Sequence, residues 1–166
     1  MSNTQDIIAA GVSLVKTVDI PSLIVPIANR ELLLPTVSVA EMLPFIKPQL
    51  RPTGLPSWFL GNVHWRGVVV PMFSYELISG ELPLPIKKTS QMAILNSTGI
   101  SRSLPFLCFP TQGIPRLSRV SPDSIIEEKQ TSLQAFDQLN VVINDDRVAI
   151  PDVSKIEQTL VELLHL

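Results

Sequence analysis

The sequence predicts a mainly β protein, arranged as a barrel or a sandwich, with helices near its two ends. Three observations lead to this fold class. The 15 prolines are spread along 166 residues, and each one removes a backbone donor that a long helix needs. Short apolar segments recur at roughly ten-residue spacing between turn residues, as they do in barrels and sandwiches. Hydrophobic residues make up 45% of the chain and charged residues 17%, which excludes disorder for most of it.

The first expected element is a helix in residues 1–20. No proline precedes Pro21. The residues that recur at steps of three and four are Ile7, Ile8, Gly11, Leu14, Val15 and Val18. Gly11 inside such a helix costs about 1 kcal/mol relative to alanine, so the helix needs a surface to pack on. We therefore predict a helical extension that packs on the body of the protein or on a partner.

The first strands are expected directly after this extension. Residues 22–27 and 31–34 are apolar segments, and Asn29 between them is available for a hairpin turn. Residues 37–42 form a further extended segment. The strongest strand signal lies in residues 62–73, which contain three consecutive β-branched valines.

Two residues qualify that strand signal. Gly67 can adopt the positive φ of a tight connection just before the valines. Pro71 removes a hydrogen bond from the sheet, so this part of the strand is expected at a sheet edge or at a bulge.

The second half of the domain begins with a proline-rich connector in residues 79–89. Residues 121–138 are expected to form a long loop with one helical turn. The strands expected around that loop are residues 92–95, 104–109, 113–120, 139–143 and 147–150.

A C-terminal helix is expected over residues 154–165. Ser154 and Glu157 have the spacing of a capping box, in which each side chain accepts a hydrogen bond from a free backbone N–H of the first turn. The residues that share one apolar helical face are Ile156, Leu160, Leu163 and Leu164.

The charge pattern argues against nucleic acid as a partner. The chain carries 13 basic and 15 acidic residues, and the basic residues are scattered except for Lys87-Lys88. A surface that neutralises several phosphates needs a basic stripe.

No apolar segment approaches the ~18 to 20 residues that span a bilayer, so we expect a soluble, cytoplasmic protein without direct membrane insertion.

The residues that carry chemistry in enzymes form no recognisable motif here. His64 and His165 are the two histidines, and neither has acidic neighbours at metal-ligand spacing. Cys108, the single cysteine, lies in an apolar segment that favours a buried thiol. We therefore expect no metal, no cofactor and no enzymatic activity; an enzyme would require His64 to lie near Ser74 or Asp152.

Residues 55–71 resemble the CheW-like family, the coupling adaptors of bacterial chemosensory arrays. The residues that occupy the family's positions at the family's spacing are Pro56, Trp58, Gly61, Arg66, Gly67 and Pro71. Val39-Ala40-Glu41-Met42 is similar to an upstream step of the family, and residues 147–152 are similar to its last strand. The resemblance extends over about residues 21–164.

This resemblance implies a fold and a function. Family members form two intertwined five-stranded SH3-like β-barrels with an apolar groove between them, which here assigns residues 21–166 to one CheW-like domain. They have no catalytic activity. They join the regulatory domain of a CheA-like histidine kinase to the cytoplasmic tip of a chemoreceptor, at receptor arrays associated with the membrane.

The resemblance also implies a set of partner-binding residues, which are Val39, Glu41, Trp65, Arg66, Gly67 and Val68. Arg66 is expected at the groove, in contact with a receptor helix; the alternative is an arginine that only fixes its own loop. Trp65 is either an exposed aromatic anchor or a core residue. Val39 and Glu41 are expected to contribute groove wall and a polar rim, with core packing as the alternative for Val39.

The chain departs from the family at two places. Ser74 stands where the family usually has an aspartate, and residues 109–113 replace a second family step. Both changes are expected to alter the surface of the second barrel. A chain with these changes resembles an accessory paralogue from the systems that control type IV pili.

The other functional hypothesis is a β-barrel module that binds a small molecule or a peptide without a kinase partner.

Overall fold

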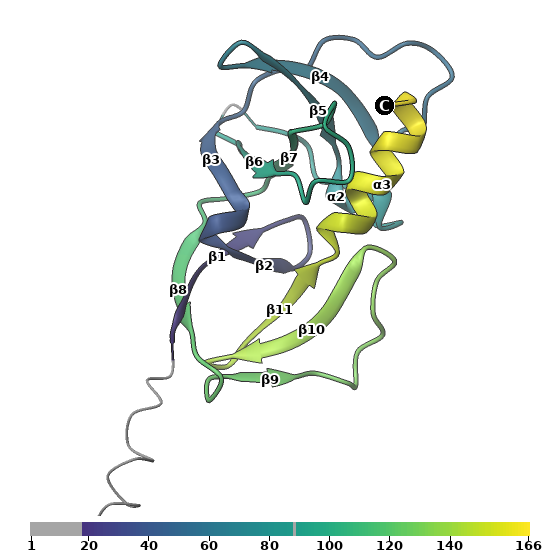
Figure 1. Ribbon diagram of the computed structural model, residues 1–166. Coiled ribbons are helices and arrows are strands. Elements are labelled where there is room, and N and C mark those ends of the chain that lie inside the picture. The colour runs from purple at the N-terminus through teal and green to yellow at the C-terminus, as the bar shows by residue number, and fades with distance from the viewer. Residues whose placement is uncertain (1–17, 88) are drawn as a thin grey trace, which may run out of the picture.

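The computed structural model describes residues 18–87 and 89–166 (Figure 1). The predicted N-terminal helix falls on residues outside this range, apart from its last three positions, where Ile20 already begins a strand. Among the described helices, none has both the length and the apolar character that crossing a bilayer requires.

The described chain forms two β-sheets. The six-stranded sheet has the order β8-β1-β2-β11-β10-β9, and the five-stranded sheet has the order β3-β6-β7-β5-β4. The strands of the first sheet are β1 (Ile20–Pro26), β2 (Glu31–Pro35), β8 (Arg116–Val120), β9 (Ile125–Glu127), β10 (Asp137–Ile143) and β11 (Asp146–Pro151). The strands of the second are β3 (Val39–Pro44), β4 (Phe59–Trp65), β5 (Val68–Phe73), β6 (Gln91–Asn96) and β7 (Phe106–Thr111).

The two sheets are intertwined along the chain. The chain leaves the six-stranded sheet after β2, builds the whole five-stranded sheet, and then returns to add β8 to β11 (Figure 1). Neighbouring strands are antiparallel except for β2 with β11 and β5 with β7, which are parallel. The mainly β fold with two β-subdomains and a C-terminal helix is therefore confirmed, and β9 adds a sixth strand to one of them.

Three short elements complete the fold. A 3-10 turn, η2 (Thr36–Ser38), joins β2 to β3, and a one-turn helix, α2 (Tyr75–Ile78), follows β5. The C-terminal helix α3 (Val153–Leu164) packs against both sheets through Ile156 and Leu160, which are fully buried. In Figure 1, α3 lies beside α2 and the five-stranded sheet.

One large core is shared by both sheets and α3. It joins Val25 and Leu32 of the six-stranded sheet to Phe73 and Phe109 of the five-stranded sheet. The Phe73 and Phe109 rings lie 5.5 Å apart between centroids. Each sheet also has a smaller apolar cluster of its own, since alternate side chains along a strand point to opposite faces. The two sheets therefore fold around common apolar contacts.

The predicted strand in residues 62–73 is two strands joined by a tight turn. β4 and β5 form a hairpin in which Trp65 pairs with Val68. The expectation of an edge position for Pro71 is wrong, because β5 lies between β4 and β7. The facing strand β4 has a register irregularity between Phe59 and Gly61, beside the position opposite Pro71. Of the two alternatives, an edge or a bulge, the edge is therefore excluded, and an irregularity lies in β4 beside Asn62, which pairs with Pro71.

Two helical features differ from the sequence expectations. The one helical turn expected in residues 121–138 is absent; that loop contains the short strand β9, while the helical turn α2 was not expected. The prediction that Ser154 and Glu157 form a capping box is also wrong. Asp152 caps α3 by accepting a hydrogen bond from Lys155 N at 3.0 Å. Glu157 is buried and accepts a hydrogen bond from Thr98 in the β6–β7 loop of the five-stranded sheet.

Candidate functional site

Arg66 lies at the tip of the β4–β5 hairpin, where the turn geometry exposes it. Arg66 has a φ of 48° and Gly67 a φ of 76°, and a pair of positive φ values is characteristic of the type I′ turn that joins twisted strands. The side chain of Arg66 is 69% exposed. The turn therefore presents a guanidinium to solvent, while the neighbouring Val68 is half-buried against the core of the five-stranded sheet.

Glu41, Trp65 and Arg66 form one polar group, which we call the Arg66 cluster. Trp65 Nε1 donates a hydrogen bond to Glu41 Oε2 at 2.6 Å, and Arg66 Nη2 lies 3.2 Å from the same oxygen. The guanidinium carbon of Arg66 lies 5.0 Å from the centroid of the Trp65 ring, a cation–π distance. A single carboxylate oxygen thus holds both the indole and the guanidinium in place.

Trp65 belongs mainly to the core, which was one of its two expected roles. Its residue exposure is 9%, and its ring meets Phe106 edge to face at 5.0 Å between centroids. Glu41 lies on β3 and Trp65 on β4, which are the opposite edges of the five-stranded sheet. Because these two edges touch, the sheet curls on itself as a barrel does.

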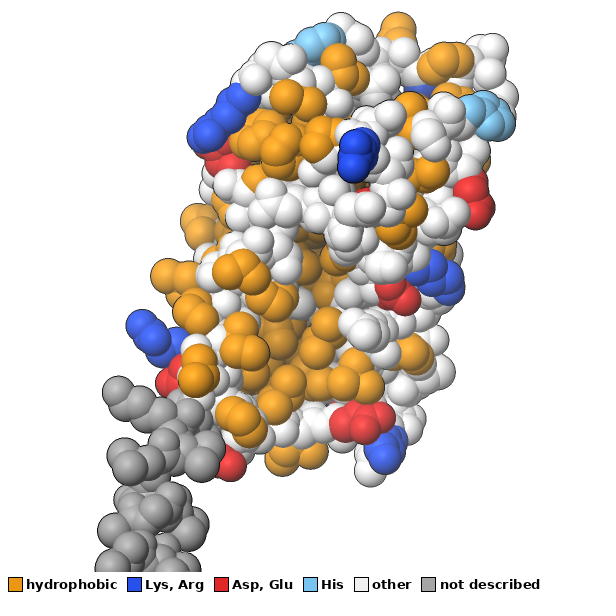
Figure 2. All heavy atoms as spheres, viewed as in Figure 1, with side chains coloured by type: hydrophobic (Ala, Val, Ile, Leu, Met, Phe, Trp, Pro, Cys, Tyr) orange, Lys and Arg blue, Asp and Glu red, His pale blue; other side chains and the backbone are white. Residues whose placement is uncertain are grey.

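A cleft of about 380 Å³ lies at the junction of the two sheets. We call it the junction cleft. Its walls come from β2, η2, the β6–β7 loop, β10, β11 and the first turn of α3; the residues are Leu33, Leu34, Pro35, Ser38, Thr98, Gln138, Ile150, Pro151, Asp152, Val153 and Ser154. Figure 2 shows a hollow lined by hydrophobic side chains on the face of the molecule that carries β2, β10 and β11. All strand residues of this cleft belong to the six-stranded sheet, and Thr98 comes from a loop of the five-stranded sheet, so the apolar groove between subdomains stays a prediction.

The predicted partner-binding residues do not line this cleft. Val39 packs against the shared core, and the Arg66 cluster lies further along the five-stranded sheet. Strand β3 connects the two regions, because Ser38 in the cleft precedes Val39, and Glu41 follows two residues later. Val37, beside Ser38, is 83% exposed. We call Val37, Val39, Glu41 and Arg66 the β3 edge, which continues from the cleft.

The residues that line the cleft were not identified from the sequence. Thr98 lies between two expected strands, residues 92–95 and 104–109, and Asp152 precedes the expected helix. Leu33 and Leu34 look like the leucines of any buried strand. No motif marks such residues, because their proximity depends on how the two sheets pack together.

A polar network joins the two subdomains on the inside. Arg30, in the β1–β2 turn, pairs with Asp137 of β10 and with Glu81 Oε1 at 2.6 Å. The hydroxyl of Tyr75 in α2 donates to Asp137 Oδ1 at 2.8 Å. Burial raises the pKa of Tyr75, and the adjacent Asp137 carboxylate raises it further. Burial by itself lowers the pKa of Arg30, but hydrogen bonds to Glu81 and Asp137 outweigh it.

A second buried carboxylate reinforces this network. Glu76 of α2 accepts hydrogen bonds from Ala28 N at 3.0 Å and from Ser74 Oγ at 3.1 Å. Ser74 is only 3% exposed and caps α2 by accepting from Leu77 N. The expectation that Ser74 alters the surface of the second barrel is therefore wrong, because this side chain is internal.

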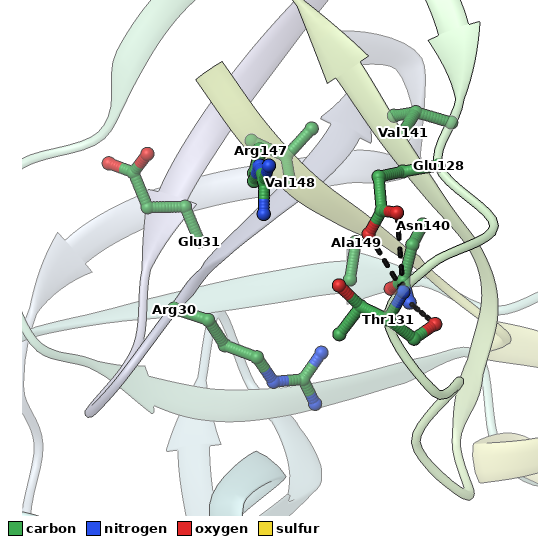
Figure 3. A pocket seen from close by; sticks show the side chains of 9 residues that line it. All are labelled: Arg30, Glu31, Glu128, Thr131, Asn140, Val141, Arg147, Val148 and Ala149. Carbon is green, nitrogen blue, oxygen red and sulfur yellow. Dashed lines mark hydrogen bonds between the residues drawn. The ribbon is translucent and has the colours of Figure 1, made fainter. Parts of the chain in front are cut away.

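A smaller pocket of about 260 Å³ bears on the small-molecule hypothesis (Figure 3). Its apolar floor includes Val141 and Val148, and Glu31 and Glu128 lie on opposite sides of it. Glu128 accepts hydrogen bonds from the N–H groups of Thr131 and Gln130, which lower its pKa. Glu31 pairs with Arg116 at 3.0 Å. Glu31 and Glu128 are thus engaged by Arg116 and by backbone N–H groups, and they do not converge on a common point, as the polar groups of a ligand site do.

The residues considered for an enzymatic site do not form one polar group. His64 is exposed on β4, where it pairs with Val69 across the hairpin. Ser74 is buried at the start of α2, and Asp152 caps α3. Cys108 is fully buried, and burial raises the pKa of its thiol, which disfavours a reactive thiolate.

Comparison with known proteins identifies the family. The family model of the CheW-like domain matches residues 21–160. No curated protein sequence matches the chain. The crystal structure of the scaffolding protein TtCheW from Thermoanaerobacter tengcongensis superposes with a TM-score of 0.68 over 83% of this chain and 87% of that one, at 14% identity, which shows a shared fold. Because the family model covers most of the sequence, this chain belongs to the CheW-like family.

Proposed function

We propose that this protein is a non-enzymatic scaffold that couples chemoreceptors to a CheA-like histidine kinase. The observation that carries the proposal is the match of the CheW-like domain to residues 21–160, since that family supports a scaffold role in chemotaxis signalling. The site geometry is consistent with an adaptor, because exposed apolar residues lie beside a few fixed polar groups. In this proposal the protein acts in the cytoplasm and is recruited to receptor arrays at the membrane.

The receptor tip, a helical hairpin, docks along the β3 edge and enters the junction cleft. Val37 and the half-buried Val39 supply apolar contact, and the half-buried Ile150 and Val153 continue it in the cleft. Arg66 is held by Glu41 and Trp65, so its guanidinium is pre-oriented for a carboxylate or a backbone carbonyl of the receptor helix. Gly67 and Val68 complete the turn that presents it. This arrangement is a helix-in-groove mode of recognition.

The kinase regulatory domain docks on the ends of the barrels, away from the β3 edge. We further propose that the protein is an accessory paralogue of a system that controls type IV pili. The support is the departure of Ser74 and residues 109–113 from the family pattern. Thr111 and Ser74 are buried, so any surface difference depends on Gln112 and Gly113, which are half-buried.

The test is reconstitution with a receptor tip and a kinase encoded in the same genome. We expect the purified chain to bind both, and we expect the receptor to change kinase autophosphorylation only when the chain is present. Receptors and kinases from the flagellar and the pilus systems are compared in parallel, and preference for the pilus pair supports the accessory assignment. If the chain binds neither a receptor tip nor a kinase regulatory domain, the proposed function is wrong.

A further inference from the structure

Helix α3 is joined to the β6–β7 loop by a single buried carboxylate. Glu157 is 0% exposed. Its Oε2 accepts hydrogen bonds from Thr98 N and Thr98 Oγ1, both at 2.6 Å, and its Oε1 accepts one from Ile100 N at 2.9 Å. Gly99 between them has a φ of 93°, which glycine adopts without strain. These charge-assisted bonds fix the loop to the helix, and we call them the Glu157 contact.

The loop held by this contact is also a wall of the junction cleft. Thr98 lines the cleft, and so do Asp152, Val153 and Ser154 at the start of α3. The β6–β7 loop forms one wall of the cleft, and the first turn of α3 forms another. The Glu157 contact therefore connects these two walls. Without these hydrogen bonds, Thr98 would lose the contacts that fix it relative to α3, and the cleft wall at that point would be less constrained.

We propose that Glu157 is a positioning residue for partner binding: its hydrogen bonds to Thr98 and Ile100 set the shape of the junction cleft that a receptor helix enters. This inference rests on the proposed function, since it takes the receptor tip as the occupant. Glu157 does not touch the partner. It holds the loop in the binding-competent position, so the partner does not have to order that loop on binding. By linkage, a partner that fills the cleft stabilises the Glu157 contact in return.

The test is Glu157→Gln, with Glu162→Gln as the matched control. Glutamine keeps the volume but places an amide donor where the carboxylate accepts from N–H groups. Glu162 lies on the same helix, is exposed, and accepts a hydrogen bond from Gln158 Nε2 at 2.9 Å. We expect E157Q to bind the receptor tip about tenfold more weakly and E162Q to bind it as the wild type does.

Amide hydrogen exchange gives a readout that a general loss of stability would not reproduce. In the wild type, the receptor tip should slow exchange at the Thr98 and Ile100 amides, and E157Q should speed exchange at these amides without affecting those of β4 and β5. If E157Q fails to fold, Glu157→Asp keeps the carboxylate but shortens the side chain by one methylene, and it should weaken binding about three- to tenfold without changing a residue of the cleft wall.

The outcomes separate this inference from the proposed function. A wild-type chain that does not bind the receptor tip contradicts the proposed function, and the inference falls with it. A wild-type chain that binds the tip, together with an E157Q or Glu157→Asp variant that binds it equally well, contradicts the inference alone.

Discussion

Two arginines in this protein differ sharply in what their ion pairs contribute. The Arg66 side chain is 69% exposed and its partner Glu41 is 34% exposed. The Arg30 side chain is 19% exposed, and its partner Asp137 is 0% exposed. Exposed pairs are screened by water and add little stability, whereas removing one member of a buried pair leaves an unpaired charge. Arg66 is therefore suited to recognition, and Arg30 to holding the fold.

Arg66→Glu should preserve the fold and reduce receptor-dependent kinase coupling. The exposed pair contributes about 1 kcal/mol or less, so the circular dichroism spectrum and the urea midpoint should stay close to those of the wild type. The reversed charge lies beside Glu41 and repels it. Arg119→Glu, an exposed charge reversal on the other sheet, is the control and should leave coupling intact. Unchanged coupling in a correctly folded Arg66→Glu variant would remove Arg66 from the docking surface.

Cys108 should make the protein less stable as the pH rises above about 8.5, the ordinary pKa of a thiol. Burial raises the pKa of Cys108 in the native state, so the unfolded chain loses this proton first. Below the thiol pKa of the unfolded chain, Cys108 is protonated in both the native and the unfolded state and does not affect the free energy of unfolding. Above that pKa, the free energy of unfolding falls by about 1.4 kcal/mol per pH unit. Urea unfolding between pH 7 and pH 9.5 measures this slope. Cys108→Ala should start less stable but lack this part of the slope, and identical slopes would contradict the argument.

At the scale of the element, the tight turn at Gly67 was easier to predict than the start of α3. Gly67 indicated a tight connection, and the Arg66-Gly67 turn has the positive φ values that glycine favours. The turn at Asn144-Asp145 has φ values of 47° and 72°, which asparagine and aspartate tolerate better than most residues. Such turns depend on a few adjacent residues. A helix cap, by contrast, depends on the position and direction in which the preceding strand ends.

The start of α3 provides a direct comparison of two candidate caps. Asp152→Ala should cost about 1 kcal/mol, because it removes the acceptor for Lys155 N. Ser154→Ala should change stability by only a few tenths of a kcal/mol, because Ser154 lies inside the first turn and is not the cap. Thermal or urea unfolding of both variants measures the difference. If Ser154→Ala proved the more damaging, the assigned cap would be wrong.

At the scale of the whole molecule, polar and apolar contacts make the two sheets one unit. The shared core includes residues of both sheets and α3, and the network around Arg30 joins the β1–β2 turn, α2 and β10. The chain also crosses between the sheets twice. We therefore expect one cooperative unfolding transition for the domain, without separate melting of the two sheets.

Arg30→Met should lower the free energy of unfolding by about 3 to 5 kcal/mol. Methionine keeps part of the side-chain volume but leaves Asp137 buried without its cation. Arg116→Met is the control, since Arg116 also pairs with two carboxylates, Glu31 and Asp146, but on the exposed surface. The control should lose little stability. Urea unfolding of the two variants measures the contrast, and equal losses would show that the buried network is not what holds the sheets together.

Much of the candidate site could be predicted only as separate pieces. The sequence indicated Arg66, Trp65 and Glu41 through a family pattern, but their common contact at one Glu41 oxygen follows from the curling of the five-stranded sheet. The assignment of Glu157 to a capping box failed for a related reason. A local spacing rule considers only neighbours along the chain, whereas Glu157 accepts its hydrogen bonds from residues 57 and 59 positions away.

The sequence by itself determined the mainly β class, the tight turns, the C-terminal helix and the family, because turn residues, proline content and motif spacing act over short stretches of chain. Only the tertiary structure decided that Pro71 lies in an interior strand, that the junction cleft is lined by residues without a motif, and that Arg30 and Glu157 hold distant segments together. The physical reason is that burial and hydrogen-bond partners arise when the sheets pack, and residues far apart in sequence then become neighbours.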